Sequence, residues 1–136
     1  MIVADTNLVC YLLIEGERTA AARSVWQRDS QWILPPLWRS EFLNVLAMAV
    51  RSSILTIDQA NRTWHHAAGL FKGCEYDPEG EAVLRTAVRT GLSAYDAQFV
   101  VVAEELSVTL VTGDREIARA CPHIADELED FAAGDG

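Results

Sequence analysis

Four acidic residues that are far apart in the sequence occupy positions from which their carboxylates could act together: Asp5, Glu41, Asp96 and Asp114. Asp5 directly follows the apolar run of residues 1–4, and Asp114 follows the β-rich run of residues 108–112 after one glycine. Ligands of open α/β sheets bind beyond the carboxyl ends of the strands, so we expect Asp5 and Asp114 at one edge of a sheet. An acid after a strand is also a common turn residue or helix cap, and this alternative stays open for each position.

The other two acids fall on predicted helices. Glu41 has Leu37 and Val45 as neighbours at helical spacing, so it borders the apolar side of a helix predicted over residues 37–51. A carboxylate there is costly unless it is paired or bound to a cation, and an ion pair with Arg39 is the alternative.

Asp96 stands three residues after Ser93, a good helix N-cap, so it could simply complete a capping box. Glu or Gln is the usual residue at that position, and the shorter Asp reaches back less well. The helix that follows is apolar on every side over residues 99–103 and must be buried. Asp96 is therefore expected at the mouth of a buried element.

Convergence of the four acids would require a cation or protonation. Two carboxylates about 5 Å apart repel by roughly 3 kcal/mol at an effective dielectric constant near 20. A donor set of oxygen atoms, without histidine or cysteine, favours the hard cations Mg²⁺ or Mn²⁺ over zinc. Such an ion can polarise a phosphate, acidify the attacking water and stabilise the leaving oxygen. The four residues thus indicate metal-assisted hydrolysis of phosphodiesters.

The elements that must position these acids alternate between strand and helix. Short strands are predicted at residues 1–4, 32–34 and 108–112, with a further candidate at 74–76. Helices are predicted over 7–14, 18–28, 37–51, 56–72, 77–91 and 93–106, with a short one after residue 114. This order predicts an α/β fold in which helices flank a short, mostly parallel sheet.

Length and composition limit the class of protein. The 136 residues fit one domain (1–136), with an acidic tail from about residue 126 whose end is expected to fray. The longest apolar stretches fall far short of the ~20 residues that a bilayer requires, and no signal peptide is recognisable, so we expect a cytoplasmic protein that does not enter a membrane. Three dispersed cysteines, Cys10, Cys74 and Cys121, suggest buried, reduced thiols. The formal net charge of -9 counts against strong non-specific binding of nucleic acids.

Taken together, four short motifs resemble a PIN domain. They are Asp5-Thr6-Asn7 after the first strand, Ser40-Glu41 on the long helix, Ala94-Tyr95-Asp96-Ala97 before the apolar helix, and Val111-Thr112-Gly113-Asp114-Arg115 after the last strand. In size the chain is similar to the single-domain VapC-type toxins of toxin–antitoxin pairs. The resemblance implies a three-layer PIN-like fold and an Mg²⁺- or Mn²⁺-dependent endoribonuclease that cleaves RNA, is held inactive by an antitoxin protein and often forms a homodimer.

The resemblance also assigns roles to individual residues. Asp5, Glu41, Asp96 and Asp114 match the metal-binding, catalytic acids, and Asn7 and Thr112 match positions that support the metal by hydrogen bonds. Many relatives carry one more acid after the last aspartate, and Glu116 is the candidate here. Arg39 and Arg115 flank two of the proposed ligands and could steer RNA, since the planar guanidinium suits phosphate, although a general bias towards arginine would explain them equally well.

Two other functions and one surface hypothesis stay open. The chain could be a non-catalytic PIN-fold binding module. A phosphatase of the haloacid-dehalogenase type is less favoured, because Asn7 stands where its second aspartate would be and Lys72 is the only lysine. The apolar residues of the two middle helices exceed what a small sheet needs and could form a dimer or antitoxin surface, the alternative being core packing: Trp38, Phe42, Leu46, Trp64 and Leu70.

Overall fold

The fold is an α/β arrangement around a four-stranded sheet. The computed structural model describes residues 1–134. The strands are β1 (Ile2–Ala4), β2 (Trp32–Ile33), β3 (Leu110–Thr112) and β4 (Ala125–Glu127), in the spatial order β2-β1-β3-β4. Every pair of neighbouring strands within the described residues runs parallel. The predicted fold class is confirmed, and the sheet has one strand more at its edge than the sequence indicated.

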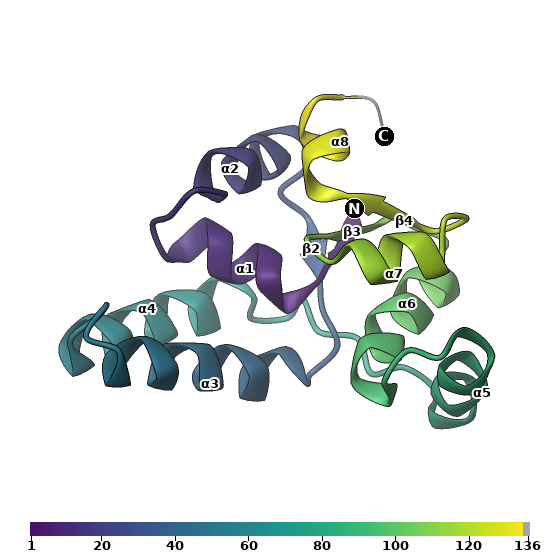
Figure 1. The fold of residues 1–136 in the computed structure, drawn as a ribbon, viewed down its shortest axis with the longest axis horizontal. Coiled ribbons are helices and arrows are strands. Elements are labelled where there is room, and N and C mark those ends of the chain that lie inside the picture. Colours follow the sequence, from purple (N-terminus) through teal and green to yellow (C-terminus); the bar gives the residue numbers. More distant parts are fainter. Residues whose placement is uncertain (135–136) are drawn as a thin grey trace.

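Eight helices cover this sheet in the described part of the chain (Figure 1). They are α1 (Thr6–Leu13), α2 (Thr19–Arg28), α3 (Trp38–Arg51), α4 (Ile57–Leu70), α5 (Gly80–Thr90), α6 (Ala94–Leu106), α7 (Arg115–Ala120) and α8 (Leu128–Ala132). Figure 1 shows α3 and α4 projecting together to one side of the sheet, with α5 and α6 on the other side.

Alternation along the strands produces the three layers. Ile2 and Ala4 of β1 face a core built with α1, α2, α3, α4 and α8, whereas Val3 faces a second core built with α6 and α7. In β3, Val111 belongs to the first core and Leu110 to the second. Because successive side chains of a strand point to opposite faces, three apolar residues in a row are what a sheet buried on both faces requires.

Two local predictions were wrong. Asp77 does not cap the helix predicted from residue 77; α5 begins at Gly80, and the Glu79 carboxylate accepts hydrogen bonds from the backbone N–H groups of Glu81 and Ala82 at 3.1 and 2.7 Å. Residues 74–76 contribute only an isolated bridge between Leu34 and Glu75. The chain passes beside β2 without continuing the ladder.

The acidic tail is folded through most of its length. β4 pairs with β3, and α8 buries Leu128 and Phe131 in the first core. These two apolar side chains anchor the segment. The predicted fraying concerns the last residues, 135–136, which lie outside the described residues.

The burial of the apolar residues of α3 and α4 tests the hypothesis that they form a dimer or antitoxin surface. Trp38, Phe42 and Leu46 lie in the first core, and Trp64 and Leu70 are only partly buried against it. Core packing therefore explains the first three. The apolar side chains that α3, α4 and their connection expose are instead Leu43, Met48, Ile54 and Ile57.

Two further predictions concern the cysteines, which were expected to be buried and reduced, and the absence of a helix long and apolar enough to span a membrane. All three cysteines are free; Cys10 and Cys121 are buried, whereas Cys74 is partly exposed, contrary to expectation. Within residues 1–134, no helix combines the length and the apolar character needed to cross a bilayer.

Candidate active site

Asp5 lies at the carboxyl end of β1 and caps α1. Its Oδ1 accepts a hydrogen bond from the Leu8 N–H at 3.0 Å, and its Oδ2 accepts from the Thr112 hydroxyl and from the Gly113 N–H at 3.2 Å. Asp5 is 4% exposed. It is thus both a helix cap and a buried carboxylate at the sheet edge, so the two readings of its position are compatible.

Asp114 reaches the same edge through strand pairing. Parallel pairing of Ala4 with Val111 brings the ends of β1 and β3 together. The Asp114 carboxylate caps α7 by accepting from the Glu116 N–H at 2.8 Å, while its own N–H donates to the Thr112 hydroxyl at 2.9 Å. Thr112 therefore links Asp5 and Asp114.

Glu41 lies in the first turn of α3 and is partly buried. It accepts a hydrogen bond from the Thr6 hydroxyl at 2.6 Å. The alternative, an ion pair with Arg39, is excluded in this arrangement because Arg39 binds Glu75 at 2.7 Å. Glu41 keeps its carboxylate without a cationic partner among the described residues.

Asp96 lies in the first turn of α6, where Ser93 accepts a hydrogen bond from the Asp96 N–H at 3.0 Å. Ser93 is the N-cap that the sequence predicted. The apolar helix beyond it is buried at Ala97 and over residues 99–103. The cap thus holds Asp96 at the entrance of a buried helix.

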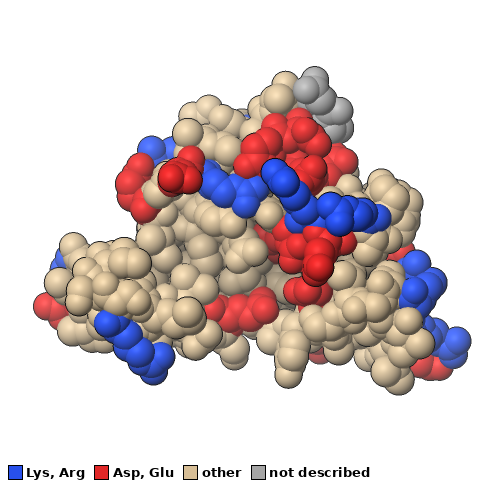
Figure 2. Space-filling model, viewed as in Figure 1, with Lys and Arg blue, Asp and Glu red and all other residues tan. Residues whose placement is uncertain are grey.

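The four acids line one cavity of about 50 Å³. The rest of its lining comes from Thr6, Asn7, Phe99 and Ile117. Figure 2 shows acidic side chains on both sides of the hollow between α7 and the start of α3. Residues separated by up to about a hundred positions are therefore brought to one site, as the motifs had suggested.

Burial and mutual repulsion shift the pKa values of three of these acids upward. Burial raises the pKa of Asp5 from 3.8 to about 6, against the hydrogen bonds from Thr112, Leu8 and Gly113, and with a further contribution from Asp114. A rise of about two pKa units corresponds to about 3 kcal/mol by which the folded protein disfavours the ionised form of Asp5.

The same two causes act on the helix-borne acids. Burial raises the pKa of Glu41, and the charge of Asp96 raises it further, although the bond from Thr6 opposes the change. Burial likewise raises the pKa of Asp96, with repulsion from Asp114 and Glu116. Each acid is thus destabilised by another member of the set.

The three residues predicted to support the metal site, Asn7, Thr112 and Glu116, differ in their burial and in their contacts with the acids. Asn7 lines the cavity but is exposed, and Thr112 is fully buried on Asp5. Glu116 is exposed in the first turn of α7, close enough for its charge to act on Asp96.

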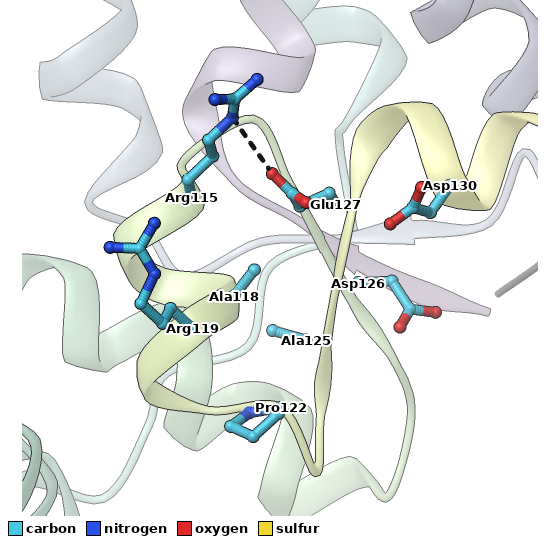
Figure 3. Close-up of a pocket in the computed structure, with 8 residues that line it drawn as sticks. All are labelled: Arg115, Ala118, Arg119, Pro122, Ala125, Asp126, Glu127 and Asp130. Carbon is cyan, nitrogen blue, oxygen red and sulfur yellow. Dashed lines mark ion pairs between the residues drawn. The ribbon is translucent and has the colours of Figure 1, made fainter.

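The two arginines with a predicted role in RNA steering are both engaged elsewhere. Arg39 is held by Glu75 and does not line the cavity. Arg115 pairs with Glu127 at 3.5 Å at the rim of a neighbouring pocket beside α7, which Arg119 also lines (Figure 3). Their part in RNA binding stays a prediction.

Three residues near the acids were missed in the sequence. Thr6 donates to Glu41, Gly113 donates to Asp5, and Arg18 contacts the carbonyl of Gly113 at 3.1 Å. Thr6 and Gly113 lie inside the motifs that carried the resemblance, so their position was a signal. Arg18 lies about a hundred residues away from Gly113, and nothing in its sequence context marked it.

The donor chemistry of the cavity fits a hard divalent cation. Four carboxylates that accept but cannot donate meet there, and none forms an ion pair within the described residues. In the arrangement described for residues 1–134, no three carboxylate, imidazole or thiol groups are close enough to share one ion. Coordination would therefore require the carboxylates to turn towards a common centre.

Known proteins share this architecture. A crystal structure of PAE2754 from Pyrobaculum aerophilum superposes with a TM-score of 0.75 at 25% identity, covering 98% of this chain and 94% of the other. Ribonuclease VapC3 from the same organism is 25% identical over 124 residues, 89% of this chain and 95% of that protein. Exonuclease VapC9, also from P. aerophilum, is 45% identical over 58 residues, 43% of each chain. The model of the PIN domain matches residues 2–121, and the chain therefore belongs to the PIN domain family.

Proposed function

We propose that this chain is a metal-dependent endoribonuclease and the toxin of a toxin–antitoxin module. The observation that carries the proposal is the meeting of Asp5, Glu41, Asp96 and Asp114 in one cavity whose lining, among residues 1–134, includes no cationic side chain. The names of the relatives VapC3 and VapC9, a ribonuclease and an exonuclease, support nuclease activity.

In this proposal Asp5, Asp96 and Asp114 hold Mg²⁺ or Mn²⁺, with Glu41 completing the set. A bound ion would supply Lewis-acid polarisation of the phosphate and an acidified water. Thr112 donates to Oδ2 of Asp5 and Thr6 donates to Oε1 of Glu41, so these hydrogen bonds would limit how the two carboxylates turn towards the ion. Asn7 and Glu116 would complete the surroundings of the ion at the rim.

We also propose two protein partners, an antitoxin and a second copy of the chain. Leu43, Met48, Ile54 and Ile57 leave apolar area exposed along α3 and α4. The groove between these helices is lined by Leu43, Leu46, Ala47, Val50, Arg51, Ile57, Ala60, Asn61 and Trp64. Exposed apolar area of this kind is characteristic of protein–protein contact surfaces.

The test is cleavage of total cellular RNA by the purified protein with Mg²⁺, with Mn²⁺ and with a chelator, followed by sequencing of the new ends. Cleavage should require the metal and disappear in Asp5→Asn protein that is folded by circular dichroism. A circular RNA distinguishes an endonuclease, which opens it, from an exonuclease, which leaves it intact.

Two outcomes would replace the proposal. Calorimetry that detects no divalent-ion binding, together with intact RNA, would indicate a binding module. Hydrolysis of a phosphomonoester, with no cleavage of RNA, would favour the phosphatase.

A further inference from the structure

The Arg18 guanidinium, which lies outside the cavity lining, forms hydrogen bonds to three residues. Its Nη1 donates to the Gly113 carbonyl and to the Tyr11 hydroxyl, both at 3.1 Å, and its guanidinium carbon lies 4.7 Å from the centre of the Tyr11 ring. Its Nε and Nη2 donate to the two carboxylate oxygens of Glu129, both at 2.9 Å. These contacts use four of the five N–H groups of the planar guanidinium.

The Gly113 carbonyl belongs to the peptide group that leads into the site. The N–H of that same peptide is the N–H of Asp114, which donates to the Thr112 hydroxyl at 2.9 Å, and this hydroxyl in turn donates to Oδ2 of Asp5. A continuous chain of hydrogen bonds therefore runs from Arg18 through one peptide and one hydroxyl to Asp5. Bonds in such a chain polarise one another, and the cation stands at its donor end.

The close approach of Arg18 depends on glycine at position 113. A Cβ atom there would lie 2.9 Å from Cε2 of Tyr11 and 3.0 Å from Nη1 of Arg18. Both separations are too short for a side chain to be accommodated without moving its neighbours. A side chain here would push Tyr11 and Arg18 aside, so glycine lets the backbone meet the guanidinium in the observed geometry.

We propose that Arg18 is a positioning residue of the active site, acting on Asp5 and Asp114 through the Gly113–Asp114 peptide. Its cation fixes the direction of that peptide, so that the Asp114 N–H points at Thr112 and the Thr112 hydroxyl points at Asp5. Arg18 itself does not line the cavity of the four acids. This role rests on the proposed function, in which Asp5 and Asp114 hold the metal.

A purely structural role is the competing explanation. Arg18 could serve only to tie α2 to α8 through Glu129. The two partners of the guanidinium separate these explanations, because Glu129→Ala removes the tie and leaves the bond to Gly113, whereas Arg18→Gln removes both charge-assisted contacts. Arg23→Gln is the matched control, since Arg23 lies on α2, which begins directly after Arg18, and among the described residues its one ion pair is with the exposed Glu15.

The experiment measures Mn²⁺ affinity by calorimetry, kcat and KM for RNA cleavage, and the amide resonances of Gly113 and Asp114 by NMR. For Arg18→Gln we expect about a tenfold loss of Mn²⁺ affinity, the range found when a residue that orients a ligand is removed. We also expect a fall in kcat with KM unchanged, and a shift of the Asp114 amide proton. Arg18→Lys should restore part of each loss, because an ammonium can still reach the carbonyl.

Glu129→Ala and Arg23→Gln should keep the Mn²⁺ affinity and the Asp114 resonance of the parent protein. If Arg18→Gln does not fold, Gly113→Ala should reproduce its signature by displacing Arg18. A folded Arg18→Gln protein with unchanged Mn²⁺ affinity and an unchanged Asp114 resonance overturns the positioning role. A parent protein that neither binds Mn²⁺ nor cleaves RNA would instead overturn the proposed function, while the Asp114 resonance still reports on the peptide.

Discussion

Asp96 illustrates the conflict between stability and function at a single residue. Burial and the charges of Asp114 and Glu116 oppose its ionisation. Asp96→Asn should therefore raise the free energy of unfolding of the metal-free protein at neutral pH by about 1 kcal/mol. The same change should lower RNA cleavage by at least about 100-fold, because a proposed ligand is lost.

Urea unfolding in the presence of a chelator, together with an RNA cleavage assay, checks this prediction. Asp77→Asn is the control, because Asp77 lies exposed in the loop before α5 and outside the cavity lining. An Asp96→Asn protein that is less stable than the parent, or that still cleaves RNA, would contradict it.

The raised pKa of Asp5 predicts a dependence of stability on pH. Asp5 titrates near 3.8 when unfolded and near 6 when folded, so the folded state binds the proton more tightly. The contribution is fully present below about pH 4 and is lost as the pH rises through 6, by about 3 kcal/mol in total.

Urea unfolding of metal-free protein between pH about 4 and about 7.5 should show this decline. Saturating Mg²⁺ should reverse it at the upper end, since a cation replaces the proton among the carboxylates. If the stability of the chelated protein instead rises across this range, the hydrogen bonds to Asp5 stabilise its ionised carboxylate more than burial destabilises it.

At the scale of elements, helix caps connect the fold to the site. Ser93 caps α6 and holds the turn that carries Asp96, whereas Thr56 caps α4 in a complete capping box and does not line the cavity. Ser93→Ala and Thr56→Ala should each cost about 1 kcal/mol of stability. Only Ser93→Ala should also lower RNA cleavage and Mn²⁺ affinity, because only that cap positions a proposed ligand.

Thermal unfolding and single-turnover cleavage of the two variants check the pair. Equal losses of activity in both would show that the site responds to general destabilisation. No loss in either would show that Asp96 is held by its helix without the cap.

The same caps explain how much of the fold could be predicted. Ser93 and the Thr56–Gln59 box were recognisable because capping depends on residues within one turn. α5 was misplaced at its start because Asp77, Pro78 and Glu79 all suit the beginning of a helix, and only the path of the chain selects Glu79.

Long-range contacts set the limit of prediction for the site. The meeting of the four acids at one cavity could be predicted because each follows a strand or begins a helix, and a parallel sheet collects such positions at one edge. Arg18 could not, because its partners Gly113 and Glu129 are selected by tertiary packing. Arg39 illustrates the reverse case, since its nearness to Glu41 in sequence did not make it a partner.

At the scale of the whole molecule, the C-terminal segment is part of the core. Leu128 is fully buried in the first core, although it lies in the acidic segment that begins near residue 126. Leu128→Ala should cost roughly 3 kcal/mol, as deletion of a buried leucine side chain usually does. Ala133→Ser, at an exposed position just after α8, should change stability by less than about 0.5 kcal/mol.

Urea unfolding of the two variants distinguishes an anchored segment from a loose one. If Leu128→Ala were as stable as Ala133→Ser, β4 and α8 would contribute little to the folded state in solution.

The net charge of the whole molecule predicts how RNA is held. The net charge is -9, and the arginines next to the proposed ligands, Arg18, Arg39 and Arg115, are each paired to a carboxylate among the described residues, so few cations beside the site are available to neutralise phosphates. Each neutralised phosphate of a single strand adds about 0.7 to the slope of log K against log salt. RNA binding should therefore show a slope shallower than about 2, and it should depend more on the divalent cation than on ionic strength.

Fluorescence anisotropy of a labelled RNA with Asp96→Asn protein across a salt series measures this slope without cleavage. Arg119→Gln tests whether the arginine beside Arg115 in Figure 3 contributes one phosphate contact, which would reduce the slope by about 0.7. A steep slope would mean that RNA displaces the acidic partners of the arginines. The acidic partners of Arg18 and Arg115 would then compete with RNA phosphates for these arginines. The affinity for RNA would in that case be limited by the negative charge of this face and would depend less on the divalent cation.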